Sequence, residues 1–159
     1  GARLTATVAA EGLRVVRRHR HIETFLVDML GLDWSEVHDE AEVLEHHLSD
    51  RIVDALDRAL GHPTEDPHGH SIPDADGHLR ERDLLPLESL EVGATGVVRE
   101  VHADAPARLQ RWKRLGFVPG CALSMIERHD FEDVMHIRVA DNVVVTGTEG
   151  VTGILVERN

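Results

Sequence analysis

The chain has 159 residues, which suits one domain or two small ones. Its 29 acidic residues outnumber the 17 basic ones and leave a net charge of −12, so the chain as a whole repels nucleic acid. The hydrophobic content of 42% is typical of a soluble globular protein, and we expect neither a membrane span nor a secretion signal. The single cysteine, Cys121, excludes an intramolecular disulfide and agrees with a cytoplasmic location.

Apolar residues at three- and four-residue spacing predict three helices before Gly61. The first covers residues 7–30 and ends at Gly31, because glycine commonly terminates helices. The second begins after Ser35, which we expect to cap its first turn. The third runs from Ser49, a further capping residue, to Gly61. The N-terminal part of the chain is therefore expected to be a helical domain.

The stretch between Gly61 and Pro86 holds four of the six prolines and no periodic apolar pattern, which indicates either a linker or an ordered irregular loop. Beyond it, short apolar runs between turn residues predict a small β barrel or sandwich, interrupted by a helical segment at residues 107–115. The runs are residues 95–98, 122–126, 134–139, 143–145 and 154–156. We therefore predict an α+β protein with a helical domain at 1–62, a linker at 63–86 and a β domain at 87–159.

Histidine is unusually frequent, with 12 copies, and it is the commonest metal ligand in proteins. At about 100° per residue, four potential ligands of the second helix share a stripe about a quarter of the circumference wide, next to the apolar side. They are His38, Glu42, Glu45 and His46. The first helix repeats the pattern, because His19 and Glu23 lie one turn apart. Packing of the two helices through their apolar sides would bring both sets together, as metal sites in helix bundles require.

An isolated Glu/His pair on a helix is most often a solvated polar face, and this interpretation stays open for the stripe. The repetition of the pattern beside apolar residues favours metal binding. Carboxylate and imidazole ligands without a thiolate suit Mn²⁺, Fe²⁺ or Zn²⁺, and the excess of oxygen ligands favours Mn²⁺. His21 and His47 point away from these stripes, and we interpret both as surface residues.

Four segments resemble the diphtheria-toxin-repressor family of metal-dependent transcriptional regulators. The dimerisation domain of that family is similar to RRHRHIETFL (17–26), GLDWSEVHDEAEVLEHHLSD (31–50) and DPHGHSIP (66–73). Its SH3-like domain is similar to LGFVPGCALSMIER (115–128). The resemblance covers almost the whole chain, and the order HxxxE, HDEAxxxEH, PHGxxIP is highly specific. It implies a three-helix dimerisation domain followed by a small SH3-like β-barrel.

The resemblance implies one metal site at Glu42, Glu45 and His46 and a second at His19, Glu23 and His38. Members with a manganese preference also use the positions of Asp66 and His68 and an acidic residue of the SH3-like domain, for which Asp104 is the nearest match. From the residues alone, Asp66 and His68 are as well explained by a structural turn as by a ligand role. Iron-type members tend to carry Cys at position 42, so Glu42 resembles the manganese type. The resemblance therefore implies Mn²⁺, with Fe²⁺ as the alternative and Zn²⁺ or Co²⁺ as substitutes.

Regulators of this family begin with a winged helix-turn-helix that binds operator DNA. Here the opening GARLT resembles the last strand of the wing, so we expect no DNA-binding residue in this chain. We expect a homodimer through the apolar residues Ile22, Phe25, Leu26, Val53 and Leu56. The resemblance implies that the intact protein represses metal-uptake genes at palindromic operators.

Other functions predict features that are weak or missing in the sequence. It contains no phosphate-binding glycine loop, nucleophile elbow or catalytic triad, so no catalytic residue is assigned and an enzyme is not expected. A metal buffer or trafficking module without DNA binding is the main alternative. A di-metal hydrolase is a weaker one, because paired carboxylates and histidines also occur where two metal ions activate a water molecule.

Overall fold

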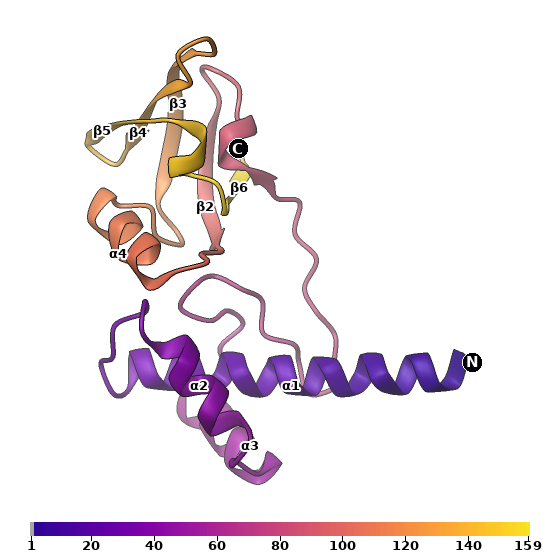
Figure 1. The fold of residues 1–159 in the computed structure, drawn as a ribbon. Helices are drawn as coiled ribbons and strands as arrows, with labels where there is room; N and C mark the ends of the chain where they lie inside the picture. Colours follow the sequence, from indigo (N-terminus) through magenta and orange to yellow (C-terminus); the bar gives the residue numbers. More distant parts are fainter. Residues whose placement is uncertain (1) are drawn as a thin grey trace. The chain divides into compact units, whose positions relative to one another are not determined.

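The computed structural model describes residues 2–159, with side chains from residue 5 onward. The chain divides into two compact units, one ending at Glu81 and the other comprising Arg82–Asn159. The first, the helical unit, contains α1 (Ala2–Asp28), α2 (Val37–Glu45), α3 (Asp50–Ala59) and the loop that follows them (Figure 1). Within the described residues, no helix is long and apolar enough to cross a membrane.

The first helix, α1, begins earlier than the apolar spacing predicts. The expectation of a wing strand at GARLT is wrong for the described part of that segment, because residues 2–5 are helical. A strand needs a neighbouring strand for its backbone hydrogen bonds, whereas a helix satisfies them within the segment. At the other end, α1 stops at Asp28. Gly31 follows with a φ of 71°, and its N–H bonds to the Val27 carbonyl.

The two shorter helices differ in how they begin. Ser49 caps α3 as predicted, because its side chain accepts a hydrogen bond from the Ile52 N–H. The prediction that Ser35 caps α2 is wrong, since the N-cap residue is Glu36 and its side chain makes no capping bond. The Ser35 hydroxyl donates instead to Asp33, which also accepts from the Ser35 N–H. Local side-chain bonding in a turn has therefore replaced helix capping.

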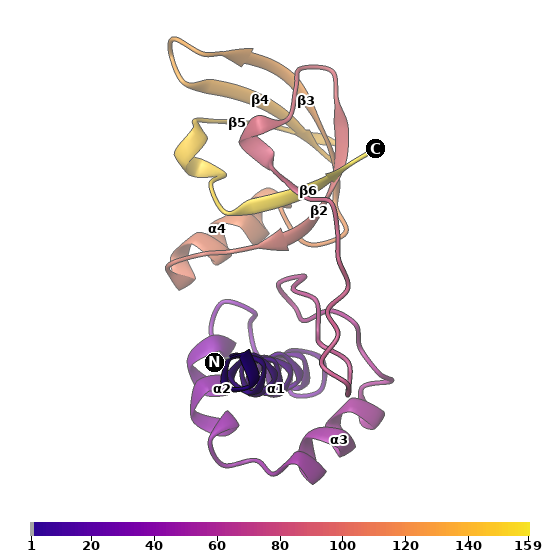
Figure 2. The same ribbon diagram turned by 90° about the vertical axis from the view of Figure 1, so that its right-hand side faces the viewer.

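An apolar cluster joins α1 to α2. Its buried members are Ile22, Leu26, Val37 and Ala41. Within each helix the two buried residues are four positions apart, so each pair lies on one side of its helix. The cluster fixes α2 against α1 (Figure 2), and it thereby decides which polar side chains of the two helices meet.

The apolar residues expected to form a dimer surface are largely core residues. Ile22, Leu26 and Val53 are buried within the single chain, so the expectation is wrong for these three. The reason is that α2 covers the side of α1 that carries Ile22 and Leu26, while Val53 belongs to α3, which packs against α1. Phe25 and Leu56 are partly buried and pack against the apolar cluster.

The loop after α3 is ordered. Glu65 and Ser71 form an antiparallel bridge, and the Ile72 N–H bonds to the Thr64 carbonyl. Ile72 is buried, and Arg20 of α1 donates to the Ser71 carbonyl. Residues 64–72 are therefore held against α1.

The second unit, the β unit, contains an antiparallel sheet of six strands in the order β1-β6-β2-β3-β4-β5 (Figure 2). The strands are β1 (Leu85–Pro86), β2 (Thr95–Val101), β3 (Ala122–His129), β4 (Val134–Val139), β5 (Asn142–Thr146) and β6 (Ile154–Arg158). One helix, α4 (Pro106–Leu115), joins β2 to β3. The apolar runs and the helical segment predicted from the sequence are confirmed, since they lie in these elements.

The interior of the β unit is apolar. Trp112 of α4, Phe117 and Ile137 are fully buried. The indole N–H of Trp112 donates to the Gly150 carbonyl at 2.9 Å, so its one polar group is satisfied inside the core.

Candidate metal centre

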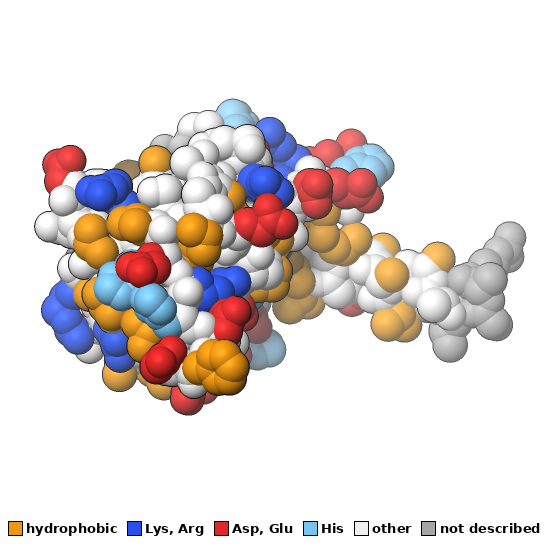
Figure 3. All heavy atoms as spheres, turned by 90° about the horizontal axis from the view of Figure 1, so that it is seen from above, with side chains coloured by type: hydrophobic (Ala, Val, Ile, Leu, Met, Phe, Trp, Pro, Cys, Tyr) orange, Lys and Arg blue, Asp and Glu red, His pale blue; other side chains and the backbone are white. Residues whose placement is uncertain are grey.

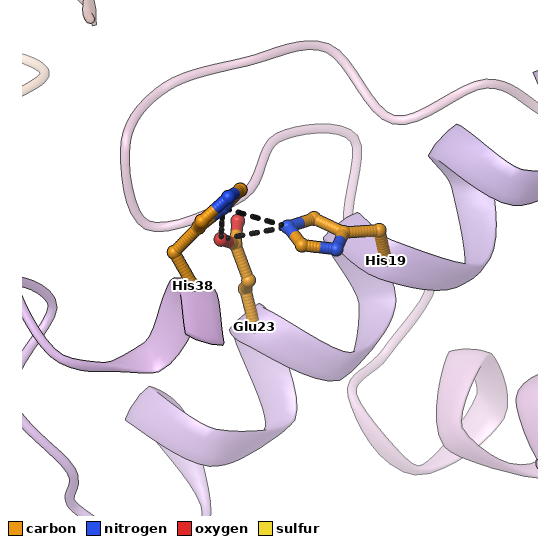
Figure 4. A group of neighbouring side chains, drawn as sticks. All are labelled: His19, Glu23 and His38. Atoms are coloured by element: carbon orange, nitrogen blue, oxygen red, sulfur yellow. Dashed lines mark hydrogen bonds and ion pairs between the residues drawn. The ribbon is translucent and has the colours of Figure 1, made fainter. Parts of the chain in front are cut away.

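Three predicted ligands converge where α1 meets α2. His19 and Glu23 project from successive turns of α1, and His38 projects from the first turn of α2 (Figure 4). The Nε2 atom of His19 lies 3.0 Å from Glu23 Oε1 and 3.2 Å from His38 Nδ1. His38 Nδ1 lies 3.4 Å from Glu23 Oε1. Ligand atoms about 2.1 Å from one ion stand about 3 Å apart, so these three side chains are spaced to share a cation.

This cluster has a buried end and an exposed end. The Glu23 side chain is 3% exposed, whereas the His38 side chain is 62% exposed. Glu23 follows Ile22 in α1, so the apolar cluster between the helices flanks the buried end. The exposed His38 leaves the other end open to solvent, which gives an ion a way in.

Glu45 reaches the same cluster from the last turn of α2. The Nδ1–H of His19 donates to Glu45 Oε2 at 2.7 Å, while its Nε2–H donates to Glu23. The imidazole therefore bridges two carboxylates, one from each helix.

The resemblance placed Glu45 in a separate site with Glu42 and His46. In the structure, Glu42 Oε1 lies 3.1 Å from His38 Nε2, and His46 Nε2 lies 3.8 Å from Glu45 Oε1. The two implied sets of ligands are thus parts of one connected network. Among the residues described, Glu42, Glu45 and His46 do not form a close three-ligand group of their own, and their assignment to a site remains a prediction.

His68 approaches Glu23 from the loop after α3. Its Nδ1 lies 3.5 Å from Glu23 Oε2, and its Nε2–H donates to the Trp34 carbonyl at 2.7 Å. The ring also stacks on the Trp34 indole with 5.6 Å between centroids. Trp34 thereby fixes the orientation of a potential ligand. No sequence pattern indicated this role of Trp34, because the hydrogen bond uses its backbone carbonyl.

Asp66 orders the loop and presents a further carboxylate oxygen. Its Oδ1 accepts hydrogen bonds from the N–H groups of His68 and His70. Its Oδ2 is buried without a hydrogen bond, although His70 Nδ1 lies 3.2 Å away and Arg20 Nε 4.0 Å away, both at ion-pair distance. A buried carboxylate oxygen in this state has spare capacity to bind a cation. The side chains of Asp66, His68 and His70 form a second close group of potential ligands. No ligand role is predicted for His70 from the sequence, although the three residues alternate along the chain.

The cluster at the α1–α2 contact shifts the proton equilibria of its members. Burial alone would lower the pKa of His19, but the hydrogen bonds and charges of Glu23 and Glu45 outweigh it and raise the pKa to about 9. Burial would raise the pKa of Glu23, but its contacts with His19 and His68 hold this pKa far below its usual range. Despite burial, Glu23 raises the pKa of His68. A metal cation must therefore displace a proton from an imidazole in order to bind here.

Asp104 belongs to the β unit and precedes α4. Its side chain is 86% exposed, and its Oδ1 lies 3.6 Å from Arg108 Nε. Its role as a ligand remains a prediction.

The two histidines interpreted as surface residues behave differently. His47 is exposed. His21 is buried, with Nδ1 bonded to the Arg17 carbonyl and Nε2 bonded to Asp57 of α3. The surface interpretation of His21 is wrong, because α3 covers this side of α1.

Two family models match the chain, one in each unit. Residues 7–74 match the model described as iron dependent repressor, metal binding and dimerisation domain. Residues 85–158 match the FeoA domain.

Curated relatives show the same relationship. The chain is 32% identical over 161 residues to the iron-dependent repressor IdeR of Mycobacterium leprae, across 94% of this chain and 66% of that protein. It is 38% identical over 152 residues to the diphtheria toxin repressor of Corynebacterium jeikeium, across 80% of this chain and 63% of that protein. The chain thus spans less than two thirds of the length of these relatives. Both are transcriptional repressors and not enzymes.

Solved structures give the same family. A manganese-dependent transcriptional repressor in complex with manganese superposes with a TM-score of 0.90 and 36% identity, covering 95% of this chain and 72% of that one. The manganese regulator SloR superposes with a TM-score of 0.80 and 27% identity, covering 94% and 69%. The chain therefore belongs to the diphtheria-toxin-repressor family of metal-dependent transcriptional regulators, with the metal-binding and dimerisation domain of that family followed by a FeoA domain.

Proposed function

We propose that this chain is the metal-sensing and dimerising part of a transcriptional repressor that responds to Mn²⁺. The observation that carries the proposal is the convergence of His19, Glu23 and His38 at the contact between α1 and α2. Because the three donors come from two helices, an ion bound to them ties α1 to α2. Ion binding is then coupled to the arrangement of the helices, as a sensor requires.

The donor set fits a divalent cation of the manganese class. All the potential ligands in the helical unit are carboxylate oxygens or imidazole nitrogens, and the only cysteine of the chain lies in the β unit. Further oxygen donors surround the three converging side chains, so hard or borderline cations are favoured over soft ones. The glutamate at position 42 and the manganese-dependent repressor in the comparisons support Mn²⁺. Fe²⁺ is the alternative, and Zn²⁺ or Co²⁺ would substitute.

We assign the ligands as two neighbouring groups. The inner group is His19, Glu23 and His38, joined by the loop residues Asp66 and His68. The outer group is Glu42, Glu45 and His46. Asp104 of the β unit is proposed as a further ligand from its sequence position. The bound ion supplies positive charge to a pocket rich in carboxylates and so replaces the protons that these groups hold in its absence.

The proposal extends to partners. A homodimer follows from the dimerisation-domain match over residues 7–74. Operator recognition is assigned to the winged helix-turn-helix that the resemblance implies, and to no residue of this chain. In this arrangement the protein acts in the cytoplasm on genes of metal uptake.

The assignment can be tested by calorimetric titration of Mn²⁺ into Glu23→Gln. Glu23 contacts three of the proposed ligands, His19, His38 and His68, so we expect the variant to lose high-affinity Mn²⁺ binding. Glu11→Gln is the matched control, because Glu11 lies on the same helix with an exposed side chain and pairs only with Arg14 among the contacts described. It should bind Mn²⁺ like the unmodified chain.

A second variant guards against a folding defect in the first. The side chain of His38 is mostly exposed, so His38→Asn should keep the fold, as checked by circular dichroism, and still weaken Mn²⁺ binding. Unchanged affinity in both variants would contradict the site. Sedimentation with and without Mn²⁺ distinguishes a sensor from a metal buffer. A sensor should change its dimerisation when Mn²⁺ binds, whereas a metal buffer binds the ion without any change in dimerisation.

A further inference from the structure

A separate group of metal-ligating side chains lies on the β3–β4 hairpin of the β unit. It consists of Glu127 and His129 on β3 and His136 on β4, with ligand atoms within 4.8 Å of one another. The proposed sensor function uses none of these residues. On the face drawn in Figure 3, neighbouring histidine side chains occur with acidic and hydrophobic side chains beside them.

Strand pairing places the three donors on one face of the hairpin. Glu127 and His129 are two residues apart in β3, so they point to the same side. His136 is the direct cross-strand partner of Glu127. The intervening pair is Arg128 and Met135, and Met135 is buried, so the other side of the hairpin faces the core. The donors therefore share the outward face.

A β-bulge produces this alignment. Met125 pairs with Ile137, whereas Glu127 pairs with His136, so Ile126 is the extra residue on β3. In regular pairing Ile126 would stand opposite His136, and Glu127 would face the core. Bulges redirect side chains and are common beside functional sites. Here the bulge brings a carboxylate next to two imidazoles.

The distances suit a small cation. His129 Nε2 lies 3.1 Å from Glu127 Oε1, and the rings of His129 and His136 meet edge to face with centroids 6.0 Å apart. Tetrahedral ligands at about 2.0–2.1 Å from zinc are separated by about 3.3 Å. One pair of donors already has this separation, and rotation of the partly exposed imidazoles can bring the third donor in. Two histidines and one glutamate are also a donor set found in zinc sites that keep a position open for water.

We propose that the β3–β4 hairpin binds a divalent transition-metal ion of the zinc class through Glu127, His129 and His136, with water completing its coordination. Imidazole is the majority ligand here, whereas carboxylates surround the cluster between α1 and α2. The hairpin therefore selects Zn²⁺ over Mn²⁺. This site is independent of the proposed sensor function.

Zn²⁺ titration of the full chain, followed by heteronuclear NMR of the histidine rings, tests the proposal. We expect the ring signals of His129 and His136 to shift, and equilibrium dialysis to show one Zn²⁺ fewer bound by His136→Asn than by the unmodified chain. Val145→Thr is the matched control, because Val145 is the exposed partner of His136 on β5 and offers no metal ligand. It should retain the full amount of Zn²⁺.

A second variant separates ligand loss from damage to the strand. His129→Gln changes an exposed residue at the end of β3 and should also lose one Zn²⁺ while the amide spectrum of the sheet is kept. Equal Zn²⁺ content in the unmodified chain and both histidine variants overturns the proposal. Zn²⁺-induced shifts confined to residues before Arg82 also overturn it.

Discussion

The helical unit and the β unit are built from different interiors. Most of the buried apolar side chains belong to the β unit, among them Trp112, Phe117 and Ile137. Of the polar and charged residues that are buried as a whole in the described structure, all but Thr146 lie in the helical unit. The helical unit therefore depends on groups that bind protons and cations, whereas the β unit depends on apolar burial, which responds to neither. This difference supports the proposal that the helical unit, and not the β unit, holds the sensor site.

The largest expected effect tests the apolar side of this comparison. Ile137 is fully buried in β4, and its truncation to alanine should lower the free energy of unfolding of the β unit by about 2–5 kcal/mol, through lost burial and the cavity left behind. Urea unfolding can be followed by fluorine NMR of fluorotryptophan-labelled protein, in which Trp112 reports on the β unit and Trp34 on the helical unit.

The control for Ile137→Ala is Val143→Ala on the neighbouring strand. Val143 is 47% exposed, so its truncation should change the free energy of unfolding by no more than about 0.5 kcal/mol. Equal losses in the two variants would show that apolar burial is not what stabilises the sheet.

The next effect distinguishes the units by their response to metal. At a free Mn²⁺ concentration one hundred times the dissociation constant, the unfolding free energy reported by Trp34 should rise by about 2.7 kcal/mol, because all the proposed ligands except Asp104 belong to the folded helical unit. The Trp112 signal should change much less, and a chelator should reverse the change at Trp34. An equal rise at both tryptophans would show that Mn²⁺ stabilises the two units alike and would contradict the comparison.

Much of this arrangement was predictable from the sequence, and the rest depended on how the elements pack. The spacing of His19 and Glu23 predicted a shared helix face, and the apolar spacing predicted that α1 and α2 would pack. The helical positions of Glu42 and Glu45 did not predict which of the two faces α1. In the structure Glu45 points inward to His19, whereas Glu42 remains more exposed. That outcome depends on how the two helices cross, and no residue pattern specifies the crossing.

The error at His21 and the unpredicted alignment on the β3–β4 hairpin have a related cause. His21 bonds to Asp57, a residue of α3 far along the chain. Its burial therefore depends on the packing of α3, which the ligand stripes on α1 and α2 do not predict. Likewise, simple alternation in β3 would turn Glu127 away from His136, and only the bulge aligns them. Local periodicity predicts the side on which a residue lies within its own element. It does not predict the neighbour that covers that side.

The smallest expected effect tests the polar side of the comparison in the absence of metal. The pKa of His19 rises from 6.5 to about 9 on folding, so this residue stabilises the helical unit fully below pH 6.5, and the contribution is lost as the pH rises toward 9. The pKa of Glu23 falls from 4.5, so its contribution is present above pH 4.5 and is lost as the pH falls through the lowered folded pKa.

With a chelator present, the thermal midpoint reported by Trp34 should therefore be highest between pH 4.5 and 6.5 and should decline toward pH 9. His19→Asn should flatten the alkaline decline, and the Trp112 midpoint should stay constant from pH 6.5 to 9. A parallel decline at both tryptophans would show that the alkaline sensitivity does not arise from the cluster between α1 and α2.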